Sequence, residues 1–307
     1  MIIEREVKGN IYTKPIIKQE HIEFINKKYK EGLSQIDISK IMQVSPSLIS
    51  KIMKENNIKI RTDREQALKY KCNEMFFNKI DTEEKAYWLG FMYADGYIQN
   101  KRKHSNYKIG ITLSEVDKKH LEKFNESLSS DYKIKTYEQS ETSYGGAYSK
   151  VIISSERLAL DLMDKGCILK KTDNLKYPND NIVPKELKIH FIRGYIDGDG
   201  SLGYSYVLNS KNGKRDKFEM KIGMVGTKEI LEGILNEFGL SHLKLDKRRK
   251  DRNNNNYQIN IGGNKQTVEL LDKLYGNCNI YLDRKYEKYL EIKERYKQYL
   301  VELASNS

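Results

Sequence analysis

The sequence has 307 residues, of which 38% are hydrophobic and 32% charged, and its 55 lysines and arginines outnumber 43 acidic residues. The formal net charge of +12 favours a polyanionic partner, with nucleic acid the leading candidate. No apolar run approaches the ~20 residues that span a bilayer, and the opening MIIEREVKGN lacks the apolar core of a signal peptide. Three scattered cysteines, Cys72, Cys167 and Cys278, indicate neither a disulfide framework nor a zinc site. These features argue against a membrane-bound or disulfide-rich secreted protein and predict a cytoplasmic one.

Residues 1–62 have the pattern of a small, separate helical unit. Apolar residues recur at helical spacing over Lys18–Lys30, and a second helix is expected after Ser34. Ser45 is a good N-cap for a third helix, with Pro46 in the first helical position. The tight turn between the last two helices predicts a helix-turn-helix DNA-binding domain, and a small helical cap with a solvated basic face is the alternative. The second helix of such a pair enters the major groove, and here it would present four polar residues: Ser47, Ser50, Lys51 and Lys54.

The rest of the chain contains two similar series of elements, after a polar linker expected at residues 63–80. A helix at Glu83–Ala94 is followed by a strand at Lys108–Ser114, a helix around residues 121–128, two further strands and another helix. The same series returns after Pro184. We therefore predict a tandem duplication, with a first repeat at residues 81–183 and a second at 184–307.

Two segments anchor the alignment of these repeats: YWLGFMYADGYI at residues 87–98 and FIRGYIDGDGSL at residues 191–202. Matching Asp95 with Asp199 also matches Gly90 with Gly194 and Ala94 with Gly198. Farther along, Ile109-Gly110-Ile111 matches Ile222-Gly223-Met224, and Tyr148 matches Tyr257. Each repeat then reads helix, two strands, helix, two strands, helix.

The repeated segment predicts a helix pair with two carboxylates at its end. Small residues one turn apart let helix backbones approach closely, so we expect Gly90, Ala94, Gly194 and Gly198 to form a helix interface about a pseudo-two-fold axis. Asp95 and Asp199 then meet where both helices end, although like charges repel and the negative end of a helix dipole disfavours them. Divalent cations between the carboxylates would remove both penalties, and Mg²⁺ suits such oxygen ligands. On a basic protein this arrangement suggests attack of water on phosphodiesters.

WLGFMYADG (residues 88–96) and IRGYIDGDG (192–200) resemble the two signature motifs of a double-motif LAGLIDADG homing endonuclease, over about residues 80–300. The resemblance implies an α+β fold in which two pseudo-symmetric αββαββα repeats form a saddle on double-stranded DNA. It implies a single-chain, monomeric endonuclease that cuts both strands across the minor groove and leaves short 3′ overhangs. Mg²⁺ would be the cofactor, with Mn²⁺ or Ca²⁺ substituting in binding. Such a protein would be bacterial or phage-encoded, with an organelle as the alternative.

The resemblance also assigns roles to individual residues. Asp95 and Asp199 would bind the metals, and Lys171 (or Lys170) and Lys285 match basic residues that the family places near the scissile phosphates. Glu115 matches loosely a polar position close to the metals. Tyr93 replaces the first acidic residue of the motif, which the second repeat keeps as Asp197. That position usually supports the helix end, so we expect Asp197 to be the dispensable acid of its motif.

DNA contacts are expected on the sheets and in their connecting loops. Lysines would mostly contact phosphates, while Gln and Arg can read base edges. The candidates in the first repeat are Gln99, Lys101, Lys103, Lys133, Lys135 and Tyr137, and those in the second are Lys214, Arg215, Lys217, Lys244, Lys247, Arg248 and Arg249.

Two alternatives to cleavage stay open. One is a DNA-binding regulator that keeps the fold without catalysis, although retention of both Asp95 and Asp199 argues against this loss. The other is a maturase, whose partner would be the intron RNA. An intein is disfavoured, because the flanking Cys or Ser and the terminal His-Asn that splicing needs are not found.

Overall fold

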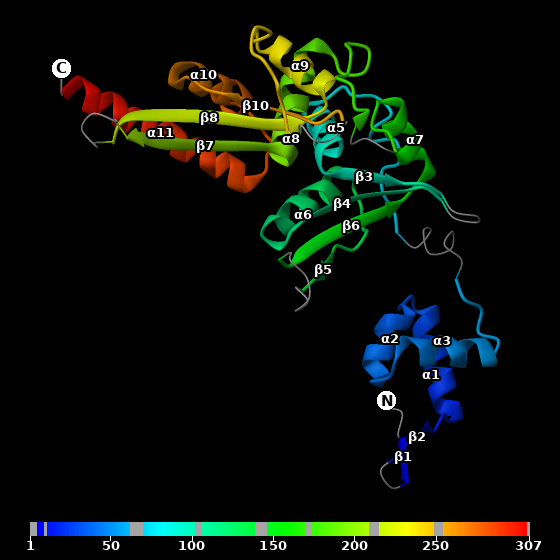
Figure 1. Ribbon diagram of the computed structural model, residues 1–307. Helices are drawn as coiled ribbons and strands as arrows, with labels where there is room; N and C mark the ends of the chain where they lie inside the picture. Colours follow the sequence, from blue (N-terminus) through cyan, green and yellow to red (C-terminus); the bar gives the residue numbers. More distant parts are fainter. Residues whose placement is uncertain are drawn as a thin grey trace. The chain divides into compact units, whose positions relative to one another are not determined.

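The computed structural model describes residues 5–8, 11–61, 70–101, 106–138, 146–169, 173–208, 215–248 and 254–305. The chain divides into two compact units, Met1–Lys69 and Tyr70–Ser307. Their elements are labelled in Figure 1. None of the helices in the described ranges combines the length and the apolar composition needed to cross a bilayer.

The first unit contains a strand pair and three helices. Strands β1 (Arg5–Lys8) and β2 (Ile11–Pro15) are antiparallel and were not expected from the sequence pattern. Helices α1 (Gln19–Lys30), α2 (Gln35–Met42) and α3 (Pro46–Glu55) follow. The hydroxyls of Ser34 and Ser45 cap α2 and α3 by accepting backbone N–H groups, as expected for these residues. The left-handed residue Gln43, with φ of 53°, ends α2 and makes the turn into α3.

The three helices enclose their own small core. Its fully buried residues come from every helix: Ile25, Ile38, Met42, Ile49 and Met53. Arg61, the last described residue of the unit, is tied to the segment after α1, because its guanidinium donates to the carbonyls of Gly32 and Leu33. The three-helix outline agrees with the helix-turn-helix prediction, which itself stays a prediction.

The second unit contains two four-stranded antiparallel sheets within the described residues, which confirms the predicted α+β class. The first sheet has the order β3-β4-β6-β5 and the second has the order β7-β8-β10-β9. The strands of the first are β3 (Gly96–Gln99), β4 (Lys108–Ser114), β5 (Lys135–Tyr137) and β6 (Tyr148–Ser154). Those of the second are β7 (Gly200–Leu208), β8 (Arg215–Gly226), β9 (Asp246–Lys247) and β10 (Tyr257–Ile261). The same order in both sheets is what a duplicated chain produces.

Helices cover one face of each sheet. The first half contributes α5 (Glu83–Ala94), α6 (Lys118–Ser127) and α7 (Glu156–Asp164), with the short 3₁₀ turn η1 (Glu115–Asp117) before α6. The second half contributes η3 (Lys185–Leu187), α8 (Lys188–Asp199), α9 (Lys228–Glu237), α10 (Asn264–Tyr275) and α11 (Asp283–Ser305). Alternate strand residues such as Ile109, Ile111 and Val151 are fully buried under the helices, so the opposite face of the sheet stays open.

Two expectations about the chain need correction. Residues 70–80, expected to lie in a linker, instead bury Phe76, Phe77 and Ile80 in the core of the second unit. The match of Tyr148 with Tyr257 is one residue out of register. Ile111 pairs with Val151, whereas its counterpart Met224 pairs with Ile259, so Tyr257 corresponds to Ser149. A slip of one residue exchanges the faces of a strand, so the two tyrosines lie on opposite faces of their sheets.

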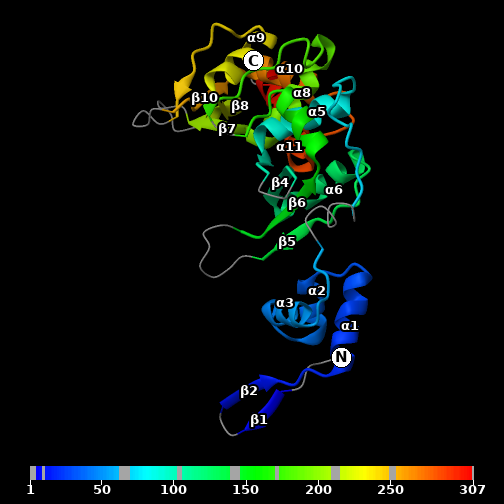
Figure 2. The same ribbon diagram turned by 90° about the vertical axis from the view of Figure 1, so that its right-hand side faces the viewer.

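Helices α5 and α8 lie side by side at the centre of the second unit (Figures 1 and 2). A Cβ added to Gly90 would lie 2.0 Å from the carbonyl oxygen of Phe191, and one added to Gly194 would lie 2.0 Å from that of Tyr87. At the end of the pair, a Cβ on Gly198 would lie 2.3 Å from that of Ala94. The four small residues therefore lie at the backbone contact between the two halves.

Charged residues join the halves as well. Arg193 of α8 is fully buried, and its Nη2 donates to Glu83 Oε1 at the start of α5 over 2.7 Å. Its Nη1 and Nε donate to the carbonyls of Leu274 and Ile280 over 3.0 and 2.9 Å, and Nη1 also lies 3.0 Å from His190 Nδ1. Arg284 Nε of α11 lies 2.9 Å from Asp117 Oδ2 of the first half. A buried guanidinium is tolerated because carbonyls and a carboxylate accept its protons.

We expect Gly90→Ala or Gly194→Ala to lower the free energy of unfolding by about 3 kcal/mol, because the added methyl meets a backbone carbonyl that cannot move aside without separating the helices. Urea unfolding measures this change. Gly203→Ala is the matched control, since a Cβ there meets nothing within 4 Å. Equal stability of all three variants would contradict the role of the glycine contacts.

Candidate functional site

Asp95 and Asp199 lie at the ends of the paired helices. Asp95 is the C-cap of α5 and is half-buried, while Asp199 is the last residue of α8 and is exposed. A Cβ added to Gly198 would lie 3.4 Å from Asp95 Oδ2, so the Asp95 carboxylate lies against the backbone just before Asp199. Strands β3 and β7 start at the next residue in each case. The close packing of small residues thus brings two carboxylates to one solvent-accessible edge.

Lys285 adds a buried cation beside these carboxylates. Its Nζ, at the start of α11, donates to the carbonyl oxygens of Ile196 over 2.7 Å and Gly200 over 2.5 Å. These are carbonyls at the C-terminal end of α8, where the helix dipole favours a cation. Burial lowers the pKa of Lys285 to about 8, with Arg284 acting in the same direction, while Asp197, Asp95 and Asp199 oppose this shift. Lys285 is therefore a buried residue rather than one of many surface lysines.

Asp197 supports the end of α8, as expected for its position, and its dispensability for the chemistry stays a prediction. Its side chain is fully buried, and its carboxylate accepts hydrogen bonds from Tyr87 Oη (2.7 Å), Tyr275 Oη (2.6 Å) and the Leu282 backbone N–H (2.7 Å). Burial raises the pKa of Asp197, and the three hydrogen bonds and Lys285 oppose that rise. Removing this acceptor would leave three buried donors without their partner, which costs more than losing an ordinary surface hydrogen bond.

Tyr93 replaces this acid in the first half and forms a different connection. It is buried, and its hydroxyl donates to the carbonyl oxygen of Lys165, just after α7, over 2.5 Å. Burial raises its pKa. Tyr93 therefore ties the end of α5 to the last helix that covers its own sheet, whereas Asp197 is bonded to residues from both halves.

His120 extends the connection of Asp197 into the first half. Its Nε2 lies 3.0 Å from Tyr87 Oη. Since Tyr87 gives its own proton to Asp197, His120 is the donor from Nε2, and its Nδ1 is a buried atom without a hydrogen-bond partner among the described residues. Burial lowers the pKa of His120 to about 3, and Lys123 and Arg284 act in the same direction. The imidazole is therefore neutral at ordinary pH.

The remaining residues expected at the cleavage centre are only partly described. Lys171 and its alternative Lys170 lie outside the described residues. Glu115 opens η1 with an exposed side chain. The helix-turn-helix candidates lie on α3, where Ser47, Lys51 and Lys54 are exposed and Ser50 is half-buried.

The open face of the first sheet carries several predicted DNA-contacting residues. Gln99 pairs with Lys108, Lys135 with Lys150, and Tyr137 with Tyr148, all on the face turned away from the helices. Lys133 is exposed just before β5, and Lys101 forms an exposed ion pair with Glu156 over 2.7 Å. Lys108, Thr112 and Lys150 share this face and were missed, although the strand alternation could have found them.

The second sheet requires a correction at Lys247. It pairs with Tyr257, which lies on the same face of β10 as the buried residues Ile259 and Ile261. Lys247 therefore lies on the helix-covered side of the sheet. Lys221 and Asn260 lie on the open face instead. Lys244 and Arg248 are exposed on either side of β9. The other candidates lie outside the described residues, as whole residues (Lys103, Lys214 and Arg249) or as side chains (Arg215 and Lys217).

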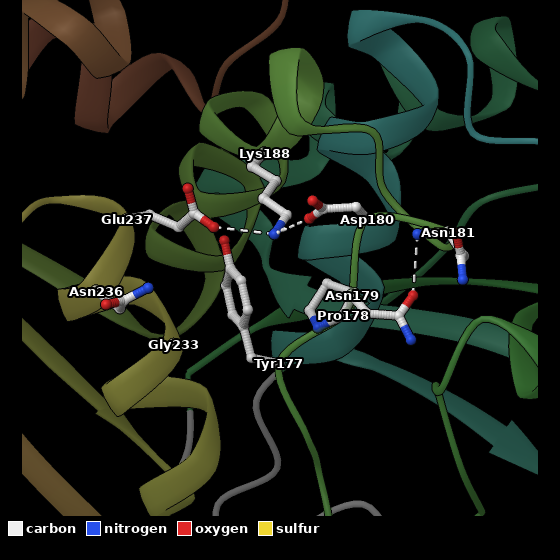
Figure 3. Close-up of a pocket in the computed structure, with 9 residues that line it drawn as sticks. All are labelled: Tyr177, Pro178, Asn179, Asp180, Asn181, Lys188, Gly233, Asn236 and Glu237. Atoms are coloured by element: carbon white, nitrogen blue, oxygen red, sulfur yellow. Dashed lines mark hydrogen bonds and ion pairs between the residues drawn. The ribbon is translucent and has the colours of Figure 1, made fainter.

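A surface cavity of about 580 Å³ lies at the opposite end of α8 (Figure 3). Lys188 points into it between Asp180 and Glu237, with Nζ–O distances of 2.5 and 2.9 Å. Lys188 is the first residue of α8 and Asp199 the last, which places the cavity a helix length of ~16 Å from the carboxylate pair. Its charges are already paired with one another, and it is separate from the acidic edge.

Comparisons with known proteins agree with this architecture. Residues 82–160 match the family model described as a LAGLIDADG-like domain. Together with the two antiparallel four-stranded sheets, this match identifies a LAGLIDADG-like fold. No curated protein sequence matches the chain.

Several solved structures are similar to this chain at low identity and with TM-scores below 0.5. The LAGLIDADG meganuclease I-AabMI, bound to uncleaved DNA, is 11% identical, with 71% of this chain and 91% of that chain covered and a TM-score of 0.47. The homing endonuclease I-LtrWI, bound to target DNA, is 13% identical, with coverage of 73% and 91% and a TM-score of 0.46. I-SmaMI, bound to uncleaved DNA with calcium ions, is 14% identical, with coverage of 72% and 92% and a TM-score of 0.48. At such low identity and TM-score, the likeness assigns no role to individual residues.

We expect the stability of the chain to fall on acidification because of His120. Its pKa is about 3 in the fold against an ordinary value of 6.5, so the unfolded chain binds more protons between these values. The stability is therefore complete above pH ~6.5 and is lost as the pH falls toward 3, with a loss of about 2 kcal/mol at pH 5. Urea unfolding at pH 7 and pH 5 measures it. His120→Gln removes the titrating group and should lose less stability over this range; an equal loss in both proteins would contradict the assignment.

Proposed function

We propose that the chain is a site-specific homing endonuclease that hydrolyses both strands of double-stranded DNA with the help of divalent metal ions. The observation that carries this proposal is the meeting of Asp95 and Asp199 at the end of the α5–α8 pair, where both sheets begin. One chain supplies both halves of the site, which supports action as a monomer. DNA-bound structures such as those of I-AabMI and I-LtrWI share the fold and agree with a DNA substrate.

The two carboxylates fit a hard divalent cation. Mg²⁺ commonly uses one or two protein carboxylates and completes its shell with water and substrate phosphate. Asp199 is exposed and Asp95 half-buried, so both are accessible to a phosphate and its water. The described residues contain no group of three or more His, Cys, Asp or Glu side chains arranged for a metal, so the remaining ligands would come from DNA and water. When bound, Mg²⁺ would activate water and neutralise developing charge on the phosphate, and Mn²⁺ or Ca²⁺ would substitute in binding.

Basic residues complete the proposed centre. Lys285 holds the end of α8 by two carbonyl contacts and supplies a positive charge beside Asp95 and Asp199. That charge offsets the repulsion between the carboxylates before metal and DNA bind. Lys171 is proposed as its counterpart for the other strand. Each half would serve one strand across the minor groove, leaving short 3′ overhangs.

The open sheet faces are proposed as the DNA-binding surface. Lys108, Lys135 and Lys150 share the open face of the first sheet, where phosphates would be contacted. Such contacts make affinity depend strongly on salt. The N-terminal helices would add a second contact region through α3, in the manner of a helix-turn-helix.

We expect Asp95→Asn and Asp199→Asn each to slow cleavage of one strand by ~10²-fold, because each removes a charged ligand needed in the transition state. The measurement is conversion of a supercoiled plasmid to nicked and linear forms with Mg²⁺. The plasmid carries the joined flanks of the insertion point of the gene. Asp164→Asn is the matched control, because Asp164 is an exposed aspartate whose partner is Lys165.

The same assay separates cleavage from simple binding. Wild-type protein that binds the plasmid site tightly but leaves it intact would favour a DNA-binding regulator. Cleavage by the Asp95→Asn, Asp199→Asn double variant at the wild-type rate would refute the proposed centre. Preferential binding of the intron transcript without DNA cleavage would favour a maturase.

We expect the Lys51→Ala, Lys54→Ala double variant to bind the target DNA more weakly, because α3 would then neutralise fewer phosphates. The slope of log affinity against log salt concentration should become shallower by about one for each phosphate that the variant no longer neutralises. Fluorescence anisotropy at several salt concentrations measures both quantities. The matched control is Lys27→Ala, Lys30→Ala, which removes the same charge from the exposed side of α1. A slope equal to that of the wild type would refute DNA contact by α3.

A further inference from the structure

Tyr87 connects the two halves in a way that the packing of small residues does not require. It belongs to α5 of the first half and is fully buried. Its hydroxyl donates to Asp197 Oδ2 of the second half over 2.7 Å and accepts from His120 Nε2 of its own half over 3.0 Å. A histidine of one half is thus joined, through one tyrosine, to a carboxylate of the other.

Asp197 lies in the last turn of α8, two residues before Asp199. This turn is held from several directions: Asp197 is bonded to Tyr87, Tyr275 and Leu282, and the flanking carbonyls of Ile196 and Gly200 accept from Lys285. Of these, Tyr87 is the contact that comes from the first half. The position of Asp199 therefore depends in part on a residue across the helix interface.

The pseudo-symmetric contact on the other side of the axis has no hydrogen bond of this kind. Phe191 is the counterpart of Tyr87, and Tyr93 is the counterpart of Asp197. Their rings make an edge-to-face contact with centroids 5.1 Å apart. The hydroxyl of Tyr93 instead donates to the carbonyl oxygen of Lys165 in its own half. The same two positions thus form a polar pair beside Asp199 and an aromatic pair beside Asp95.

We propose that Tyr87 is a positioning residue for the Asp199 centre, acting across the interface through Asp197. This inference rests on the proposed cleavage function. Loss of the Tyr87 hydroxyl removes one donor from a fully buried carboxylate and leaves His120 Nε2 without its acceptor, so the last turn of α8 relaxes. The end of α5 keeps its Tyr93 contact, so the Asp95 centre stays in place. The two strands of the DNA should then respond differently.

The test is cleavage of a DNA duplex that contains the joined flanks of the insertion point of the gene. Each strand carries its own distinguishable end label, so the two cleavage rates are measured separately. Asp95→Asn and Asp199→Asn first show which strand depends on which centre. Tyr87→Phe should slow the Asp199-dependent strand by about tenfold, since displacements near 1 Å cost up to about 100-fold. The other strand should keep the wild-type rate, so nicked DNA accumulates, and DNA affinity should stay unchanged.

A matched control and a second variant keep the test decisive. Tyr132→Phe removes another tyrosine hydroxyl of the first half, which donates to the Ser154 carbonyl over 3.1 Å, and it should cut both strands at the wild-type rate. Tyr275→Phe removes the other hydroxyl donor to Asp197 and should give the same strand bias as Tyr87→Phe. The second variant decides the question if the first does not fold.

A measurement without cleavage completes the test. Ca²⁺ titrated by calorimetry into the protein–DNA complex should bind Tyr87→Phe more weakly than Tyr132→Phe, because the Asp199 carboxylate is displaced. Equal slowing of both strands together with unchanged Ca²⁺ affinity would show a merely structural role and overturn the inference. Failure of the wild type to cut, or cutting by the Asp95→Asn and Asp199→Asn variants at its rate, would instead overturn the proposed function.

Discussion

The contact of Gly90 with the carbonyl oxygen of Phe191, repeated as Gly194 against that of Tyr87, is the constraint on which the rest of the second unit depends. A methyl group at either glycine would lie 2.0 Å from the opposing oxygen, so α5 and α8 can approach this closely only without side chains there. The close approach brings the helix ends together and places Asp95 beside the backbone of Gly198. Because β3 and β7 start directly after Asp95 and Asp199, it also sets where the two sheets begin.

Bringing the halves together also buries charged side chains. Those of Arg193, Lys285 and Asp197 each have hydrogen-bond partners. Arg193 donates to Glu83 and to main-chain carbonyls, and Lys285 donates to the carbonyls at the end of α8. Asp197 accepts three hydrogen bonds. Separating one of these groups from its partner leaves a buried charge or donor without a hydrogen bond, which lowers stability. The groups therefore favour this arrangement of the two halves over arrangements in which α5 and α8 are shifted along each other. These hydrogen bonds specify how the two halves are aligned, which the glycine contacts alone would not do.

Features that depend on residues close together in the sequence were predicted well, whereas contacts between residues far apart in the sequence were not. The caps Ser34 and Ser45 and the small-residue stripe follow from patterns within a few residues, and the repeated series of elements follows from aligning the chain with itself. The hydrogen-bond partners of Asp197 could not be predicted, because its donors Tyr275 and Leu282 lie 78 and 85 residues away along the chain. The mistaken match of Tyr148 with Tyr257 arose because two tyrosines agree in type, whereas strand pairing, which decides the face, is not visible in one sequence. Lys247 was placed on the wrong face for the same reason.

Two halves in one chain need not stay equal, and this chain shows how they diverge. In a symmetric pair of identical subunits, the same two residues would meet on both sides of the axis, because each contact would be repeated by the symmetry. Here one meeting is Tyr87 with Asp197, a hydrogen bond, and the other is Phe191 with Tyr93, a ring contact. The glycine contacts are alike on the two sides of the axis, with a Cβ 2.0 Å from the opposing carbonyl oxygen in each case, whereas the polar network is one-sided. The carboxylates at the helix ends are therefore alike in position but not in what holds them, and the difference was introduced without disturbing the glycine contact that aligns them.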